Sequence, residues 1–241
     1  MLSDYVIEHG LDIMAISETW LRDDDFNIFF CHDICPVGYK LYHVPRTTSE
    51  GGGIALLVRK QFKVSKQQAD YRCFEVCEIV LKSSGNHNLR LVIIYRPPPS
   101  TANGLTVSLF FEEFSAYLEY LTLVPGHLLL VGDYNFHVDQ PNDSDARRFT
   151  QILNSFDLKQ HVVGATHRDG HTLDLVITRD CEKDIISDCL VCHRMSDHFA
   201  VQCKLDFAKP PLERKEVIFR KIRSIDFDNF RYELECSSLV S

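Results

Sequence analysis

Short apolar runs separated by turn residues dominate the pattern of hydrophobic and polar positions along the chain. Runs of this length, bounded by Gly, Pro, Asn or Asp, are typical of β-strands, and alternation of polar with apolar residues marks strands buried on one face. Residues 73–81 alternate in this way, whereas residues 127–131 are continuously apolar. The pattern predicts strands at residues 11–17, 54–58, 73–81, 89–95, 127–131, 172–178 and 199–205.

Helical spacing of apolar residues occurs in fewer places. It predicts a short helix at residues 2–9 that ends at Gly10, a longer one at 106–123, and another at 144–156 with Ser144 as its N-cap. Many strands with few, well-separated helices favour a layered α+β domain. The regular strand–helix alternation of a doubly wound parallel sheet is absent from the pattern.

The composition is that of a folded protein with a sizeable core. The chain has 241 residues, of which 45% are hydrophobic, and one domain is expected at this length. The formal net charge of −8 disfavours a protein that coats nucleic acid without specificity, since such proteins are usually basic. Any nucleic acid is therefore expected to contact a local basic patch, or metal ions held by carboxylates.

The cysteines and the lengths of the apolar runs bear on the compartment. Nine cysteines are scattered without the spacing of a small secreted disulfide scaffold. This usage favours a reducing, intracellular compartment, and the nucleus is one candidate. No apolar run approaches the roughly 20 residues of a membrane helix, so no membrane partner is expected.

Polar clusters that carry possible chemistry lie directly at strand ends. They are residues 17–19 (Ser-Glu-Thr), residues 132–135 (Gly-Asp-Tyr-Asn), Asp174, and residues 196–198 (Ser-Asp-His). A carboxylate at the end of a buried strand is held rigidly and is partly desolvated, which suits a hard metal ion or a general base.

Asp174 is the most informative of these acids. It interrupts an apolar strand between Leu173 and Leu175, and a buried carboxylate requires a partner. His198 is the natural candidate, because a carboxylate that binds one ring nitrogen of a histidine leaves the other free for catalysis. Taken singly, each cluster is more often a solvated strand end, a helix cap or a turn. Their joint occurrence, each in a strand context, favours a catalytic site.

The order of these motifs resembles the endonuclease/exonuclease/phosphatase superfamily. Within it, the motifs are most similar to those of the apurinic-endonuclease-like domain of non-LTR retrotransposons, over about residues 1–207. The motifs that carry the resemblance are SETW (17–20), GGGIALLV (51–58), IYRPP (94–98), VGDYN (131–135), THRDGHTLDLVIT (166–178) and SDHF (196–199).

The resemblance implies a fold and a cofactor. The fold is a four-layer α/β/β/α sandwich, in which two sheets pack face to face with helices outside. The implied activity is hydrolysis of a phosphodiester with Mg²⁺ or Mn²⁺. By the same resemblance, Glu18 is a metal ligand and Asp197 supports the metal site. Hard oxygen ligands of this kind favour Mg²⁺ over softer metals.

The resemblance also implies catalytic roles for five residues. Asp133 and Asn135 position and activate the attacking water. His198 contacts the scissile phosphate and stabilises the charge of the transition state, and Asp174 orients His198. Tyr95 matches the tyrosine that lies near the phosphate in this family.

Both ends of the chain depart from the pattern of the family. Family members begin with a strand that carries an asparagine, so the chain is expected to lack this first strand and to be truncated at its N-terminus.

Residues 208–241 are predicted to be a charged linker or tail fragment. Six basic and two acidic residues between 209 and 223 give that segment a net charge of +4. A reverse transcriptase module is expected in the parent polyprotein and is absent from this chain.

Three functions remain open at this point. The first is a metal-dependent endonuclease that nicks duplex DNA, its expected partner, and leaves a 3′-hydroxyl for retroelement insertion. The second keeps the fold but acts on lipid or other phosphoesters. The third is a catalytically inactive, retroelement-derived remnant, which the expected loss of the first strand suggests.

Other signals favour structural roles. Cys189 and Cys192 form a C-x-x-C without a second pair, so ordinary strand cysteines are expected rather than a zinc site. The histidine at position 167 is expected in a solvated loop. Trp20 and Phe110 are expected in the core.

Overall fold

The computed structural model describes residues 2–22, 25–45, 51–82, 88–100, 103–211 and 226–237. The chain divides into two compact units, Met1–Pro211 and Leu212–Ser241. In the second unit, helix α5 (Phe227–Glu235) begins at the N-cap Asp226, and all its residues are exposed or nearly so. No helix within the described residues has the length and apolar character needed to cross a bilayer.

A six-stranded sheet forms one half of the first unit. Its strand order is β4-β5-β6-β7-β9-β8, and all neighbours are antiparallel except the parallel pair β6 and β7. A parallel pair requires a long crossover, which here contains helix α3. The strands are β4 (Lys63–Gln67), β5 (Glu75–Lys82), β6 (Leu89–Tyr95), β7 (His127–Asp133), β8 (Leu158–Gln160) and β9 (Asp174–Arg179).

Two helices cover the outer face of this sheet, α3 (Val107–Leu123) and α4 (Ser144–Ser155). Their apolar faces pack on the sheet in one cluster with many aromatic rings, among them Phe114 and Phe149. The N-cap of α4 is Asp143, whose carboxylate accepts hydrogen bonds from the backbone of residues 145 and 146. The prediction of Ser144 as N-cap was wrong by one position, because Asp143 reaches the free N–H groups of the first turn.

A second layer of strands faces the other side of the six-stranded sheet. It contains a three-stranded antiparallel sheet of order β1-β3-β2 and a hairpin of β10 and β11. A cluster that includes Ile54, Ile79 and Ile93 fills the space between the layers. The strands are β1 (Ile13–Ser17), β2 (Tyr39–Val44), β3 (Ile54–Arg59), β10 (Ile186–Arg194) and β11 (Phe199–Leu205), with the 3₁₀ helix η1 (Asp180–Ile185) leading into β10.

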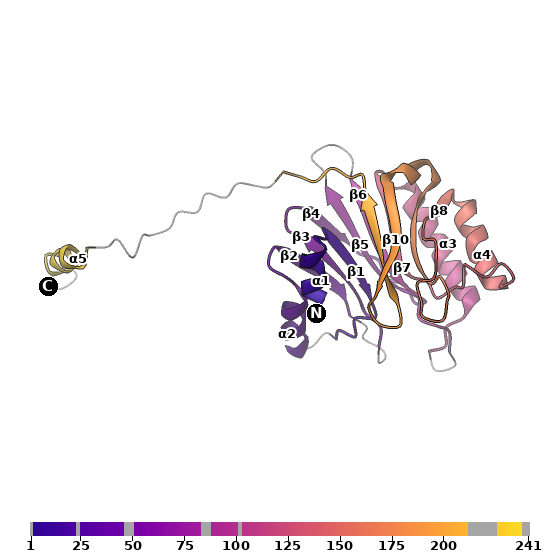
Figure 1. The fold of residues 1–241 in the computed structure, drawn as a ribbon, viewed down its shortest axis with the longest axis horizontal. Helices are drawn as coiled ribbons and strands as arrows, with labels where there is room; N and C mark the ends of the chain where they lie inside the picture. The colour runs from indigo at the N-terminus through magenta and orange to yellow at the C-terminus, as the bar shows by residue number, and fades with distance from the viewer. Residues whose placement is uncertain are drawn as a thin grey trace. The chain divides into compact units, whose positions relative to one another are not determined.

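The fourth layer consists of α1 (Leu2–Glu8) and α2 (Asp25–Ile34). Val6 of α1 packs on Tyr39 and Leu57 at the outer face of the three-stranded sheet. Helices therefore lie outside two facing layers of strands, as Figure 1 shows. The predicted mixed α/β sandwich is confirmed. The prediction of a missing first strand concerns residues outside this chain and stays a prediction.

The two aromatic residues expected in the core have different environments. Phe110 is buried in the cluster beneath α3, as predicted. Trp20 is 66% exposed, so its predicted core position is wrong. The reason is local: Trp20 follows the end of β1, where the chain leaves the sheet and turns toward α2.

Candidate functional site: an acidic cluster around His198

The register of three adjacent strands brings their polar ends together. Tyr95 at the end of β6 lies opposite Asp133 at the end of β7, and Asp133 lies opposite Asp174 at the start of β9. Gly132 makes this close packing possible, because a Cβ on it would overlap the carbonyl oxygen of Ile94. Residues far apart in the sequence thus meet at one edge of the six-stranded sheet.

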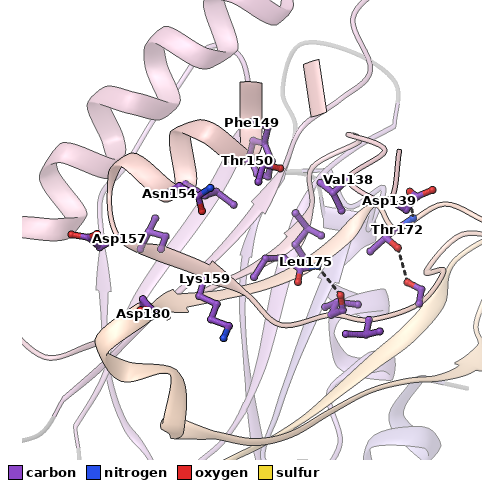
Figure 2. Close-up of a pocket in the computed structure, with 16 residues that line it drawn as sticks. Val138, Asp139, Phe149, Thr150, Asn154, Asp157, Lys159, Thr172, Leu175 and Asp180 are labelled. Carbon is purple, nitrogen blue, oxygen red and sulfur yellow. Dashed lines mark hydrogen bonds between the residues drawn. The ribbon is translucent and has the colours of Figure 1, made fainter. Parts of the chain in front are cut away.

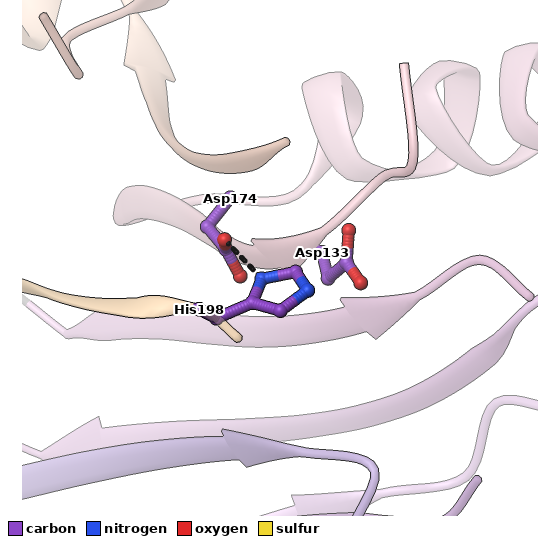
Figure 3. Close-up of side chains that lie close together, drawn as sticks. All are labelled: Asp133, Asp174 and His198. Carbon is purple, nitrogen blue, oxygen red and sulfur yellow. Dashed lines mark hydrogen bonds and ion pairs between the residues drawn. The ribbon is translucent and has the colours of Figure 1, made fainter. Parts of the chain in front are cut away.

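His198 reaches the same edge from the turn between β10 and β11. A backbone bridge joins it to His167, and the Phe199 N–H donates to the Thr166 carbonyl at 2.7 Å. Its Nδ1 lies 2.7 Å from a carboxylate oxygen of Asp174. Figure 3 shows the imidazole between the carboxylates of Asp174 and Asp133. The predicted pairing of Asp174 with His198 is present.

Thr166 holds Asp174 in place. Its buried hydroxyl oxygen accepts hydrogen bonds from the backbone N–H groups of Leu173 and Asp174, each at 2.9 Å. The start of β9 is thereby fixed, and the Asp174 carboxylate remains free for His198. Thr166 belongs to a quoted motif, but the sequence alone did not single it out.

Asp133 is buried, with 3% of its surface exposed. Its carboxylate accepts hydrogen bonds from the backbone N–H and the side-chain amide of Asn135, both at 3.0 Å. The same amide donates to the Arg96 carbonyl at 2.8 Å, and Asn135 has a positive φ of 52°. A non-glycine residue in this backbone region is strained, and such strain is concentrated at functional sites.

Arg96 is a supporting residue that the sequence analysis did not identify. It is buried, and its guanidinium donates to the carbonyls of Tyr134 and Asn135 at 3.2 and 3.0 Å. Its Cζ also lies 4.0 Å from the centre of the Phe136 ring. Arg96 therefore fixes the loop after β7 that carries Asn135. Arg96 belongs to the IYRPP motif, and this membership is the sequence signal that could have identified it.

The electrostatics of the cluster displace two pKa values. Burial, followed by the nearby charge of Asp174, raises the pKa of Asp133 to about 7. The hydrogen bond with Asp174 is the main cause that raises the pKa of His198 to about 9. At neutral pH the histidine is therefore protonated beside a carboxylate that is close to its titration point.

Glu18 and Tyr95 form a neighbouring contact. The Tyr95 hydroxyl donates to a carboxylate oxygen of Glu18, which follows β1 with a positive φ of 52°. The charge of Glu18 also contributes to the raised pKa of Asp133, so the two carboxylates belong to one acidic region. The structure thus brings five predicted site residues together with Glu18.

Asp197 lies at the margin of this region. Its side chain is 51% exposed, and a carboxylate oxygen lies 3.9 Å from Nε2 of His167. Its pKa is lowered by hydrogen bonds from its own backbone and from Ser196. His167, expected in a solvated loop, is instead half-buried and joins Asp197 to the turn that carries His198.

The side chains present fit a divalent cation. Within the described part of the chain, Asp133, Asp174 and His198 form the group whose potential ligand atoms all lie within 4.8 Å of one another. A buried carboxylate next to two more acids is electrostatically unfavourable, and a cation offsets that repulsion. Carboxylate oxygens, of which the region offers several, are the donors that hard divalent ions prefer.

A separate pocket lies on another part of the sheet. It has a volume of about 700 Å³ and opens beside α4 and the β8–β9 edge, with Phe149, Leu153 and Leu158 in its wall (Figure 2). None of the seven predicted site residues lines it. This pocket and the acidic cluster are therefore lined by different residues.

The sequence decides the family to which this geometry belongs. A model of the Endonuclease/Exonuclease/phosphatase family matches residues 1–198. The chain belongs to this family. The family consists of hydrolases that act on phosphoesters. The comparison with curated proteins found no match to the chain.

Solved structures of nucleases and phosphatases share the fold of this family member. The endonuclease domain of TRAS1, a telomere-specific non-LTR retrotransposon, has a TM-score of 0.66 and 14% identity over 86% of this chain and 92% of its own. The AP endonuclease LMAP from Leishmania major has a TM-score of 0.65 and 14% identity over 87% and 82%. A Bacteroides thetaiotaomicron mannosyl-6-phosphatase has a TM-score of 0.56 and 14% identity over 86% and 89%. These likenesses show the fold.

Proposed function

We propose that the chain is a divalent-metal-dependent endonuclease that nicks duplex DNA. The observation that carries the proposal is the meeting of Asp133, Asp174 and His198, with Glu18 beside them, at one edge of the sheet. In-line hydrolysis of a phosphodiester requires a base for the attacking water and positive charge near the phosphate oxygens. This edge offers both.

Asp133 is the proposed base. Its raised pKa is close to neutrality, which suits a group that takes a proton at physiological pH. The Asn135 amide holds the carboxylate through the bond at 3.0 Å and thus orients the lone pair that receives the proton. The water oxygen attacks phosphorus as its proton passes to Asp133, the P–O3′ bond breaks, and the leaving 3′-oxygen takes a proton from solvent. The products are a 3′-hydroxyl and a 5′-phosphate.

His198 is the proposed donor to the phosphate. Asp174 holds Nδ1 and keeps the ring protonated, so Nε2 is available to donate to a non-bridging oxygen. A donor that already points at the developing charge stabilises the transition state without reorganisation. Because the ring is cationic near neutral pH, this role suits His198 better than metal ligation.

Glu18 and Asp197 are the proposed metal-binding acids. Glu18 is held by the Tyr95 hydroxyl at the same edge, and this contact also orients Tyr95 toward the expected phosphate. A bound Mg²⁺ or Mn²⁺ would supply Lewis-acid stabilisation of the phosphate charge. Asp197 lies farther from the cluster, beside His167, so we assign it the supporting role.

Duplex DNA is the proposed substrate because the SETW, IYRPP and TLDLVIT motifs resemble those of retroelement endonucleases. A fold neighbour is a retrotransposon endonuclease domain, which agrees with this choice. The proposal places the nick at the start of retroelement insertion, with a reverse transcriptase module as the expected partner. Another fold neighbour is a sugar phosphatase, which makes small phosphoesters the alternative substrate to test.

Nicking of supercoiled plasmid in Mg²⁺ or Mn²⁺ tests the proposal. We expect relaxed circles whose 3′ ends a DNA polymerase extends, and a loss of at least about 100-fold for Asp133→Asn, because the base is removed. Asp188→Asn is the matched control, since Asp188 is an exposed acid of β10 away from the cluster. Absence of nicking in both metals would leave an inactive remnant. Equal rates for Asp133→Asn and the control would reject Asp133 as the base. Hydrolysis of phosphate monoesters or lipid phosphoesters instead of plasmid would reassign the substrate.

A further inference from the structure

Trp20 combines an exposed side chain with a backbone conformation that is unusual for an aromatic residue. It is the single tryptophan of the chain, and 66% of its surface is open to solvent. Tryptophan is on average a highly buried residue, although a single exposed apolar residue needs no special explanation. The backbone supplies a second observation. Trp20 has a positive φ of 57°, a conformation that bulky residues rarely adopt.

The loop holds this strained conformation firmly. The N–H groups of Thr19 and Trp20 donate to the carbonyls of Gly53 and Gly52 at 3.0 and 2.7 Å, continuing the pairing of β1 with β3. The indole lies beside Gly51, where an added Cβ would be 3.7 Å from the ring. Strain that is maintained without burial of the side chain points to a function rather than to packing.

The place of Trp20 connects it to the acidic cluster. It stands two residues after Glu18, whose carboxylate is bound by the Tyr95 hydroxyl. Tyr95 lies opposite Asp133 in the pairing of β6 with β7. Trp20 is therefore on the same loop as Glu18, the proposed metal ligand, and two residues from it.

We propose that Trp20 is a stacking platform for a nucleobase of the substrate, next to the scissile phosphate. The proposal rests on the proposed function, since it names how that site holds nucleic acid. A base that leaves the stack of the duplex can stack on an aromatic ring, a contact that is tolerant of sequence and adds affinity without positive charge. An acidic protein gains from such a contact, because it lacks the general attraction that basic proteins exert on phosphates.

Because Trp20 is the single tryptophan, its fluorescence reports directly on this contact. The probe is a short DNA duplex, added to the Asp133→Asn chain so that the DNA stays intact. A duplex with abasic sites and inorganic polyphosphate serve as ligands that offer phosphates with fewer or no bases. We expect saturable quenching by the intact duplex, weaker quenching by the abasic duplex, and none by polyphosphate.

Variants complete the test. Trp20→Ala should weaken binding of the duplex about tenfold, measured by anisotropy of labelled DNA, and raise KM for nicking more than it lowers kcat. Trp20→Phe retains a ring and should recover most of the affinity. Glycine adopts a positive φ without strain, so we expect the Trp20→Gly chain to be at least as stable to unfolding as the Trp20→Ala chain. Its affinity for the duplex should be as low as that of Trp20→Ala, because neither variant has a ring.

The outcomes separate this proposal from the proposed function. Quenching and ring-dependent binding without any nicking would reject the endonuclease and keep the stacking platform. Normal nicking with no quenching, or with unchanged KM in Trp20→Ala, would reject the platform and keep the endonuclease. Absence of both binding and nicking would overturn both, whereas equal quenching by polyphosphate and by DNA would reject the platform alone.

Discussion

At the scale of single residues, the site works by placing acids where water does not screen them. Asp133 is buried, and the charge of the neighbouring Asp174 adds to burial in raising the pKa of Asp133. His198 relieves part of this repulsion by remaining protonated against Asp174. Asp133, the proposed base, and His198, the proposed donor, therefore have raised pKa values on the two sides of physiological pH. This arrangement is expected of groups that transfer protons.

These two pKa values predict a bell-shaped pH profile for nicking. The value of kcat/KM should rise as Asp133 loses its proton near pH 7 and fall as His198 loses its proton near pH 9. Asp174→Asn removes the main cause that raises the pKa of His198, so its alkaline limb should move to lower pH. Initial nicking rates across the neutral and alkaline range, with the metal saturating at each pH, measure both. An alkaline limb that stays in place in Asp174→Asn would contradict the assigned pairing.

At the scale of elements, the register of the β10–β11 hairpin decides which of its cysteines face each other. The register places Cys189 opposite Cys203, and their sulfur atoms lie 3.3 Å apart. Both side chains pack toward the cluster between the two strand layers. Cys192 stands an odd number of positions from Cys189, so alternation along the strand turns it to the other face. The C-x-x-C of the sequence is therefore two unrelated cysteines.

This register predicts a specific disulfide under mild oxidation. Diamide, which is reduced to its hydrazine as two thiols become a disulfide, should link Cys189 to Cys203, because directly opposed antiparallel positions have a Cα separation that a disulfide spans. Trypsin cleaves after Arg194 between the two cysteines, so mass spectrometry identifies the linked peptides. Cys203→Ser is the control and should give no such link. A Cys189–Cys192 link in the native chain would show that β10 does not have the described register.

At the scale of the whole molecule, packing and the site belong to the first unit. The three apolar clusters and all seven predicted site residues lie within Met1–Pro211. The last strand is followed by a segment that remains attached, since Asp206 N–H donates to the Ile185 carbonyl and Lys209 forms an ion pair with Asp12. The chain divides into its two compact units after Pro211. The domain boundary after residue 207 stays a prediction.

Truncation after Pro211 should therefore leave folding and chemistry intact. We expect the midpoint of thermal unfolding and kcat for nicking to match those of the full chain. The basic residues between 209 and 223 mostly leave with the second unit, so KM for DNA should rise, and its dependence on salt should weaken. Circular dichroism and nicking at two salt concentrations measure these quantities. A lowered unfolding midpoint would show that the second unit stabilises the first.

Much of the fold followed from local pattern. Strands with continuous or regularly alternating apolar residues, such as β3 and β6, were predicted, as were the strongly periodic helices α3 and α4. Elements that were not predicted are short, half-exposed or exposed: α2, α5, β2, β4, β8, β10 and the 3₁₀ helix η1. In β10, for example, the burial of successive residues is irregular and the register shifts twice, so the strand has no clear period of two.

The sequence by itself determined which residue types stand at strand ends, where the apolar runs lie, and hence the layered α/β class and the family. Tertiary structure alone decided that Tyr95 contacts Glu18, that Arg96 and Thr166 support the site, and that Trp20 is exposed. The physical reason is that periodicity and burial are recorded in neighbouring residues. Contacts between residues 24 or 77 positions apart, as in Asp174–His198 and Glu18–Tyr95, depend on strand register and on the packing of two sheets.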